Sequence, residues 1–287
     1  MRGRILIAEI RGFCSGVERA VQLVERAAAE GPFPVRVLHE IVHNESVVEE
    51  FRKKGVLFAE ELDPAWEGGT LIFSAHGVSE KVERQARAMN VNLIDATCPL
   101  VKGIHRKAVE LEREGYRILL IGKRSHREIE GVVGRVHRPP VVLESQHDAE
   151  TVEFEPGAKY ACLTQTTLSV DDCAGLFRIL RRRFPEIRIC GGICNATTAR
   201  QTAVKKLAAR CGRILVIGSG KSSNSRKLRE VAESCGAEAI LIASIAELPD
   251  SWLVDGDIGI TSGASAPEHL LREAVEKLTA LGWTLER

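Results

Sequence analysis

The chain has 287 residues, of which 44% are hydrophobic and 28% are charged, and its formal net charge is +1. This balance is typical of an ordinary globular protein of about two average domains, and it points to no nucleic acid partner. The apolar part of the N-terminal segment is too short for a signal peptide, and no stretch approaches the roughly 18 apolar residues of a membrane span. We therefore expect a cytoplasmic protein with no membrane association.

Eight cysteines in a reducing compartment are better explained as metal ligands or core residues than as disulfides. None of them forms a C-x-x-C pair, which disfavours a zinc ribbon. Cys98 follows an apolar run over 91–95 that predicts a buried strand, and a helical pattern begins at Pro99. The start of a helix favours a thiolate, the form that binds a soft metal. A lone cysteine of this kind is more often a small core residue.

The position of Cys98 recurs at Cys14 and Cys194, which also lie between a predicted strand and a predicted helix. We call these three positions the cysteine corners. If they converge, they present three thiolates from three separate parts of the chain. Cys190 is the competitor of Cys194, but it lacks the Ala-Thr-Thr helix start that follows Cys194. The other cysteines are expected in the core or as spectators, namely Cys162, Cys173, Cys211 and Cys235.

An internal repeat links the cysteine corners. Each repeat has two strands, each followed by a polar corner, before the strand that leads to the next cysteine. A polar corner is a short run of His, Ser, Thr, Asn or Glu between a strand and a helix, and the first one follows its cysteine by about 28 residues in every repeat. The last repeat lacks its final strand and cysteine, which residues 4–14 supply. The predicted strands are 4–10, 35–38, 71–73, 91–94, 118–121, 160–163, 187–189, 214–217 and 258–260.

The repeat predicts an α/β fold of three pseudo-threefold-related units with small parallel sheets, closed by the N-terminal strand. The predicted units are 14–97, 98–193, and 194–287 together with 1–13. Ligands of open parallel sheets lie at the carboxyl ends of the strands, where all of these corners fall. The polar corners are 43–44, 74–77, 125–128, 164–167, 221–224 and 261–265.

Taken together, the corners resemble the family of 4-hydroxy-3-methylbut-2-enyl diphosphate reductases, the last enzymes of the non-mevalonate isoprenoid pathway. The chain departs from the usual family pattern at Ser125, Arg127, Asn195 and Arg226, where the first two replace Gly and Pro. The matching stretches follow the order of the family over nearly the whole chain and are 12–17, 42–44, 74–78, 95–101, 164–169, 196–198, 222–225 and 261–268.

The resemblance implies one 4Fe–4S cluster per chain, central to the three units and held by Cys14, Cys98 and Cys194. Three thiolates leave one iron open for the allylic hydroxyl of the substrate. Two electrons, from an external donor such as ferredoxin or flavodoxin, and two protons then give isopentenyl or dimethylallyl diphosphate and water. Glu128 is the expected proton donor, with Thr166 as its relay or orienting residue.

The substrate diphosphate is expected to contact imidazoles and the hydroxyl, amide and N–H donors at helix starts. Each histidine could instead be a structural hydrogen-bonding residue, and Glu128 a surface carboxylate attracted by the helix dipole. The expected contacts are His43, His76, His126, Thr166, Ser222, Ser223, Asn224 and Ser265.

Residues 218–222 imitate a phosphate-binding P-loop, but the first glycine of that motif is replaced by Leu215. We therefore expect no nucleotide there, and a solvent-facing or indirect role for Lys221. Two other functions compete with the reductase. A hydro-lyase of the aconitase kind would use three cysteines without outside electrons. A non-catalytic electron carrier would not need the polar corners, and its cluster spectrum would not respond to an allylic diphosphate.

Overall fold

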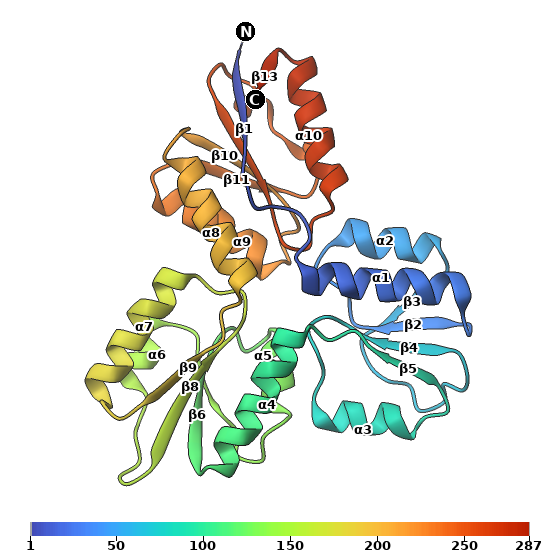
Figure 1. Cartoon of the computed structure of the whole chain (residues 1–287), viewed down its shortest axis with the longest axis vertical. Coiled ribbons are helices and arrows are strands. Elements are labelled where there is room, and N and C mark those ends of the chain that lie inside the picture. The colour runs from blue at the N-terminus through green and yellow to red at the C-terminus, as the bar shows by residue number, and fades with distance from the viewer. Residues whose placement is uncertain (1, 287) are drawn as a thin grey trace. The chain divides into compact units, whose positions relative to one another are not determined.

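The computed structural model describes residues 2–286, and its strands form three small parallel sheets with helices packed against them (Figure 1). Sheet B has the strand order β3-β2-β4-β5. Its strands are β2 (Val35–Leu38), β3 (Leu57–Ala59), β4 (Thr70–Phe73) and β5 (Asn92–Asp95). The helices of this part of the chain are α1 (Ser15–Glu30), α2 (Glu45–Lys53) and α3 (Glu80–Ala88).

Sheet C repeats this order as β7-β6-β8-β9. Its strands are β6 (Tyr116–Ile121), β7 (Val141–Leu143), β8 (Lys159–Thr164) and β9 (Arg188–Gly191). The helices are α4 (Pro99–Arg113), α5 (Arg127–Val133), α6 (Gln146–Thr151) and α7 (Val170–Arg183). Parallel neighbours need such helical crossovers, which is why helices alternate with strands along the chain.

Sheet A has the order β11-β10-β12-β1-β13 and combines both ends of the chain. Its strands are β1 (Gly3–Ile7), β10 (Arg213–Ile217), β11 (Glu238–Ile242), β12 (Ile258–Ser262) and β13 (Trp283–Leu285). The helices are α8 (Asn195–Ala208), α9 (Ser223–Ser234) and α10 (Glu268–Ala280), with 3-10 turns η1 (Ile245–Glu247) and η2 (Asp250–Trp252). Strand β1 occupies the position that β5 and β9 occupy in the other sheets.

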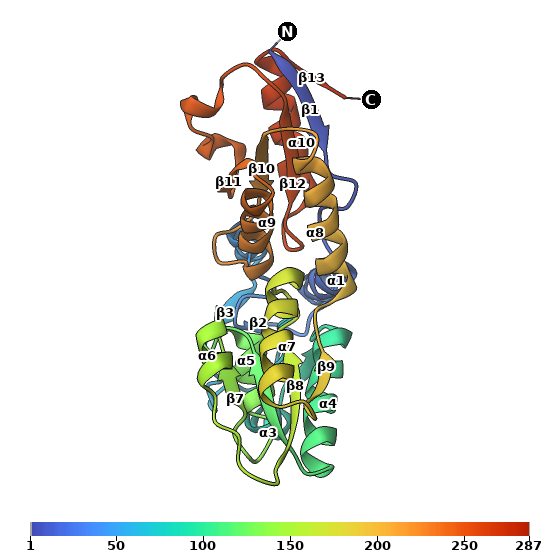
Figure 2. The ribbon, with the colours of Figure 1, turned by 90° about the vertical axis from the view of Figure 1, so that its left-hand side faces the viewer.

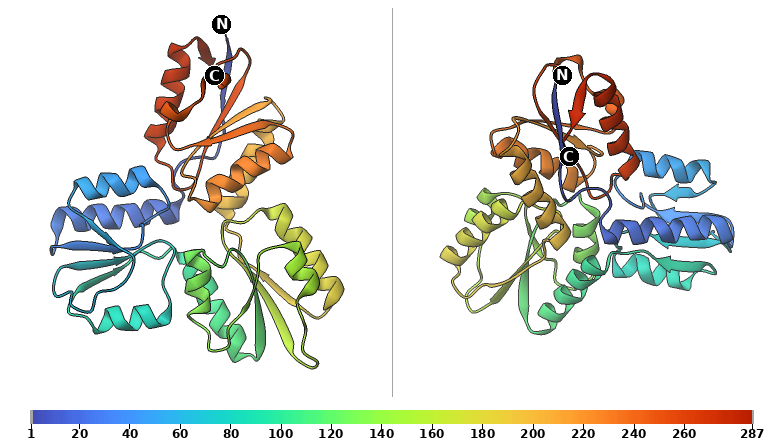
Figure 3. Two further views of the ribbon diagram at one scale, coloured as in Figure 1. Left: turned by 180° about the vertical axis from the view of Figure 1, so that it is seen from behind. Right: turned by 45° about the horizontal axis from the view of Figure 1, so that its top comes forward.

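The predicted α/β fold with three small parallel sheets is confirmed, and Figure 3 shows each sheet with its helices. The division into units 14–97, 98–193 and 194–287 with 1–13 stays a prediction. The described residues divide into two compact regions, each defined by the contacts among its own residues. Region I comprises the residues up to Glu18, His43–Val47 and those from Asn195 onward, and it contains sheet A. Region II comprises Arg19–Val42 and Val48–Cys194, and it contains sheets B and C.

The inner strands supply much of the core, because helices cover them on both faces. All residues of β4 and β12 are buried, and so are the last four of β10. The prediction of a buried strand over 91–95 was wrong in one respect. β5 pairs with β4 alone, so it is an edge strand, with Asn92 exposed and the other residues partly buried.

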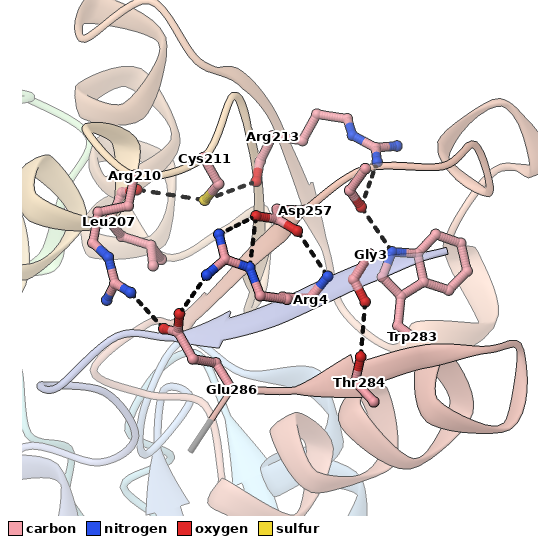
Figure 4. A network of polar contacts seen from close by, with 11 residues as sticks. Gly3, Arg4, Leu207, Arg210, Cys211, Arg213, Asp257, Trp283, Thr284 and Glu286 are labelled. Atoms are coloured by element: carbon pink, nitrogen blue, oxygen red, sulfur yellow. Dashed lines mark hydrogen bonds and ion pairs between the residues drawn. The ribbon is translucent and has the colours of Figure 1, made fainter. Parts of the chain in front are cut away.

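The two terminal strands are held together by a polar network (Figure 4). Arg4 contacts Asp257 at 2.6 Å and Glu286 at 2.9 Å, and Arg210 contacts Glu286 at 2.5 Å. The Arg4 guanidinium keeps the pKa of Asp257 below its usual range. The indole N–H of Trp283 donates to the carbonyl of Gly256 at 2.9 Å. Strand β1 therefore lies beside β13 as a full member of sheet A, as Figure 2 also shows.

Within residues 2–286, no helix combines the length and the apolar character that crossing a membrane requires.

Candidate active site

The three cysteine corners have the same backbone environment. Each cysteine directly precedes a helix, is partly buried, and donates its N–H to a carbonyl in the polar corner of the neighbouring strand. In Region I the bond joins Cys14 to Ala264 at 3.2 Å, and in Region II the bonds join Cys98 to Ala75 at 3.0 Å and Cys194 to Thr166 at 3.1 Å. The equivalence predicted from the repeat thus holds at the level of single hydrogen bonds.

Two cations and one carboxylate lie beside the backbone just before Cys98, the N-cap residue of α4. Arg19 donates to the carbonyls of Thr97 and Asp95 at 3.3 and 3.4 Å, and Lys102 contacts the Asp95 carboxylate at 2.6 Å. Burial raises the pKa of Asp95, but hydrogen bonds from Lys102 and Thr97 outweigh this and leave that pKa below its usual value. Cys98 thus lies at a helix start, a position that in general favours thiolate ligands.

The other cysteines lie in different surroundings. Cys190 belongs to β9 rather than to a corner, and its thiol contacts the carbonyl of Arg188 at 3.9 Å. Cys162, Cys173 and Cys211 are buried, and Cys235 is exposed at the end of α9. Burial raises the pKa of the Cys162 thiol far above its ordinary value. Such a thiol stays protonated and makes a poor ligand.

Glu128 and Thr166 come together in the interior of Region II. Only 6% of Glu128 is exposed, so the alternative of a surface carboxylate is wrong. The Thr166 hydroxyl lies 2.8 and 2.9 Å from the two carboxylate oxygens, and the Thr166 N–H donates to Oε2 at 3.0 Å. The carbonyl of Thr166 accepts the N–H of Cys194. One threonine therefore joins the buried carboxyl to a cysteine corner.

His76 and His126 are neighbours in Region II. Their rings are 5.9 Å apart and perpendicular. His126 is the N-cap of α5, and its Nδ1 accepts the N–H of Glu128 at 3.2 Å. A neutral His126 must then carry its proton on Nε2. Both rings are largely buried, and Nδ1 of His76 lies 3.4 Å from the hydroxyl of Ser74.

The start of α9 in Region I contains buried polar atoms without partners. Ser222 caps this helix by accepting the N–H of Ser225 at 3.3 Å. Asn224 is 3% exposed, and neither its amide nitrogen nor its oxygen has a hydrogen-bond partner among residues 2–286. The hydroxyl of Ser225 also has none there. Buried polar groups are normally hydrogen-bonded, so these atoms are suited to a ligand or ordered water.

Other predicted residues of Region I lie nearby in the fold. The Ser265 hydroxyl donates to the backbone carbonyl of His43 at 3.0 Å, and Ser223 is buried in the first turn of α9. Lys221 faces solvent as expected, and its amine lies 3.6 Å from Glu45. The structure groups His43, Ser222, Ser223, Asn224, Ser265 and Cys14 in Region I, and His76, His126, Glu128, Thr166, Cys98 and Cys194 in Region II.

Arg200 was not predicted as a site residue. This arginine of α8 is 3% exposed, and it donates to the carbonyls of Gly12 at 2.6 Å and Ala196 at 3.0 Å. It lines an open pocket of about 460 Å³ in Region I together with Cys14 and Glu268. A single arginine in a helical pattern is normally a surface residue, so only the packing reveals its position.

Among the described residues, neither region contains three His, Cys, Asp or Glu side chains gathered as a metal site. Residues 5–279 match the family model "LytB protein". Over 283 residues the chain is 45% identical to "4-hydroxy-3-methylbut-2-enyl diphosphate reductase 2" of Burkholderia mallei, covering 98% of this chain and 87% of the relative. The reductase of that name from Nitrosomonas europaea is 44% identical, with 96% and 87% covered.

A solved structure of "E-1-hydroxy-2-methyl-but-2-enyl-4-diphosphate reductase" from Plasmodium falciparum is also similar. The TM-score is 0.94 at 36% identity, covering 99% of this chain and 91% of that one. A second solved reductase, "the Terminal Enzyme of the Non-Mevalonate Pathway", gives a TM-score of 0.70 at 31% identity, with 98% and 100% covered. Because the family model and these relatives each span nearly the whole chain, the chain belongs to the LytB protein family.

Proposed function

We propose that this chain reduces 4-hydroxy-3-methylbut-2-enyl diphosphate to isopentenyl and dimethylallyl diphosphate. The C–O bond of the allylic alcohol breaks, two electrons and two protons are taken up, and water leaves. Family membership and the names of the relatives support this reaction. The observation that carries the proposal is the pair of contacts made by Thr166. Its hydroxyl binds the buried carboxyl of Glu128, and its carbonyl accepts the N–H of Cys194, which precedes a helix.

Cys14, Cys98 and Cys194 would hold one 4Fe–4S cluster per chain. Their donor chemistry fits such a cluster, because all three are partly buried thiols in the same backbone position at a helix start. When bound, the cluster would pass on the two electrons from the external donor and would act as a Lewis acid. Cys190, inside β9, has no comparable position.

Glu128 would deliver a proton to the departing hydroxyl, because hydroxide is a poor leaving group. Thr166 holds the carboxyl through its hydroxyl and its N–H, which fixes the direction in which the acid can donate. Two bonds from one residue leave the carboxyl little rotational freedom. Thr166 could also bind the substrate hydroxyl, since a hydroxyl both donates and accepts hydrogen bonds.

The diphosphate would be bound by the remaining predicted residues. Asn224 supports this assignment most strongly, because phosphate oxygens would satisfy its unpartnered amide nitrogen at the start of a helix. The further proposed contacts are His43, His76, His126, Ser222, Ser223 and Ser265. We also propose a cytoplasmic location, an external electron donor such as ferredoxin or flavodoxin, and no nucleic acid or membrane partner.

Anaerobic reconstitution tests this function. We expect about four iron and four sulfide per chain, a cluster spectrum that changes when the allylic diphosphate is added, and turnover only with a reductant. Turnover without a reductant would show a hydro-lyase of the aconitase kind. A cluster whose spectrum ignores the allylic diphosphate would show an electron carrier.

A further inference from the structure

His105 is a buried histidine that the proposed chemistry does not use. It lies on the buried face of α4 with Val101, Ala108 and Leu111, and it is 5% exposed. Its Nε2 has no hydrogen-bond partner among residues 2–286. An apolar side chain would fill this helix face without burying an unpaired nitrogen. The position therefore needs an explanation other than core packing.

The His105 ring lies against two glycines from different elements. A Cβ on Gly77 would lie 2.8 Å from its Cε1, and a Cβ on Gly131 would lie 2.9 Å from its Nε2. Gly77 directly follows His76 and has a φ of +78°, and Gly131 belongs to α5. The His105 ring therefore lies between the loop that carries His76 and helix α5, whose first turn carries Glu128. We call the ring in this position the wedge.

The C-terminal end of α5 is bound to the same loop and to the first turn of α3. The N–H of Glu80 donates to the carbonyl of Gly134 at 3.1 Å, and Arg135 donates to the carbonyl of Val78 at 3.0 and 3.2 Å. Arg135 also contacts Glu83 at 2.7 Å. The first turn of α5 is held through the carboxylate of Glu128, which Thr166 binds. The His105 ring lies against Gly131 between these two ends, and it therefore limits how closely the loop that carries His76 can approach the helix.

The chemistry of the imidazole suits a narrow wedge. A neutral imidazole can leave Nε2 without a hydrogen, so this edge is thinner than the C–H edge of a phenylalanine. Burial and then the Arg135 cation lower the pKa of His105 to about 4, against the smaller opposing effects of Asp95 and Glu83, while Lys102 lowers it further. The ring is therefore neutral at physiological pH and can lie directly against Gly131.

We propose that His105 is a positioning residue that sets the spacing between His76 and His126. The inference rests on the proposed function, because that function assigns both histidines to the substrate diphosphate. The perpendicular rings of the pair, 5.9 Å apart, are the geometry that the wedge maintains. Two imidazoles can share one diphosphate only when their separation matches it, so a changed separation weakens binding more than chemistry.

Kinetics of the reconstituted holoenzyme test the proposal with three single variants. His105→Ala removes the wedge, and Gly131→Ala pushes a methyl group against it while favouring the helix, so that variant should fold. We expect each to raise KM for the allylic diphosphate by about tenfold, with kcat changed by less than about threefold. Leu111→Ala is the control, since Leu111 is buried on the same face of α4. It should lower the melting temperature and leave KM unchanged.

A double variant and a direct binding measurement complete the design. In Gly131→Ala/His105→Ala the methyl group meets no ring, so KM should be no higher than in His105→Ala alone. Calorimetry with inorganic diphosphate should show the same order of affinities. If His105→Ala matches Leu111→Ala in KM, or if the two substitutions multiply in the double variant, the positioning role is wrong. If the wild-type enzyme neither binds diphosphate nor turns over the substrate, the proposed function fails as well.

Discussion

The corner around Thr166 in Region II and the corner around Ala264 in Region I share a backbone feature and differ in their side chains. Both residues accept the N–H of a cysteine. Thr166 also holds the buried carboxyl of Glu128, whereas the alanine has no polar side chain. In Region I the prominent buried polar group is Asn224, which has no partner among the described residues.

This difference separates what the repeat supplies from what single side chains add. The repeated backbone places a cysteine before a helix three times. A buried group whose bonds are made within the protein, such as Glu128, is held in one orientation. A buried group without such bonds, such as Asn224, is available for a ligand. The four predictions below test these distinctions, from the largest expected effect to the smallest.

The largest effect concerns the shared backbone feature. Replacing Cys14, Cys98 or Cys194 by Ser should abolish or severely reduce cluster binding, because a hydroxyl is a poor substitute for a soft thiolate. Cys190→Ser should leave the cluster intact, since Cys190 lies within β9. Iron and sulfide counts on anaerobically reconstituted protein measure the result. Equal iron loss in Cys190→Ser would show that the equivalent backbone positions do not identify the ligands.

The second effect concerns the side chain that only one corner has. Glu128→Gln keeps the shape of the group but cannot deliver a proton, so kcat should fall by at least about a hundredfold. Cluster content and substrate binding should persist. Glu130→Gln is the matched control, because Glu130 lies on the same helix and pairs at the surface with Arg127. Near-normal turnover by Glu128→Gln would move the acid role to His126 or to a water held by Thr166.

The third effect concerns His105, a buried neutral histidine whose Nε2 has no hydrogen-bond partner among residues 2–286. Its pKa of about 4 in the folded state lies below the ordinary 6.5, so the unfolded chain binds the proton first as the pH falls. The contribution of neutral His105 to the free energy of unfolding is therefore fully present above pH 6.5. As the pH approaches 4, the free energy of unfolding falls by up to about 3 kcal/mol through this one group. Urea unfolding across this range should show a flatter pH profile for His105→Ala than for the wild type. Parallel profiles would contradict the assigned pKa.

The smallest effect compares Asn224 of Region I with Thr166 of Region II directly. Asn224→Ala removes two unpaired polar atoms, so it should leave the free energy of unfolding nearly unchanged while raising KM about tenfold. Thr166→Val leaves the carboxyl of Glu128 short of a donor and should lower that free energy by about 1 to 3 kcal/mol. Chemical denaturation of both variants provides the measurement. A large stability loss in Asn224→Ala would mean that Asn224 is already satisfied within the protein.

The inner strands could be predicted from sequence because each is a short apolar run buried on both faces, as in 70–73 and 214–217. Strands β3, β7, β11 and β13 were not predicted. Each pairs with a single neighbour at the edge of its sheet, and β3, β7 and β13 are only three residues long. The edge strands β5 and β9 could be predicted because the internal repeat places a strand before Cys98 and Cys194, a signal that the other edge strands lack.

The candidate site could also be predicted from sequence only in part. The cysteines and Glu128 could be named from the repeat and the family resemblance, because they fall at the ends of recognisable strands. The two bonds from Thr166 to Glu128, the burial of Arg200 and the contacts of His105 with two glycines depend on packing between distant segments. No local pattern encodes such contacts. That the named residues act as proposed stays a prediction.

The placement of β1 has a consequence for the order in which the protein can be made. Sheets B and C consist of consecutive stretches of chain and can form as soon as those stretches leave the ribosome. Sheet A cannot, because β1 at the very start must wait for β12 and β13 near the end (Figure 4). The hydrogen bond from the N–H of Cys14 to the carbonyl of Ala264 likewise cannot form until Ala264 has been synthesised. A cofactor that requires Cys14 in this position can therefore be completed only after β12 and residues 261–265 have been synthesised.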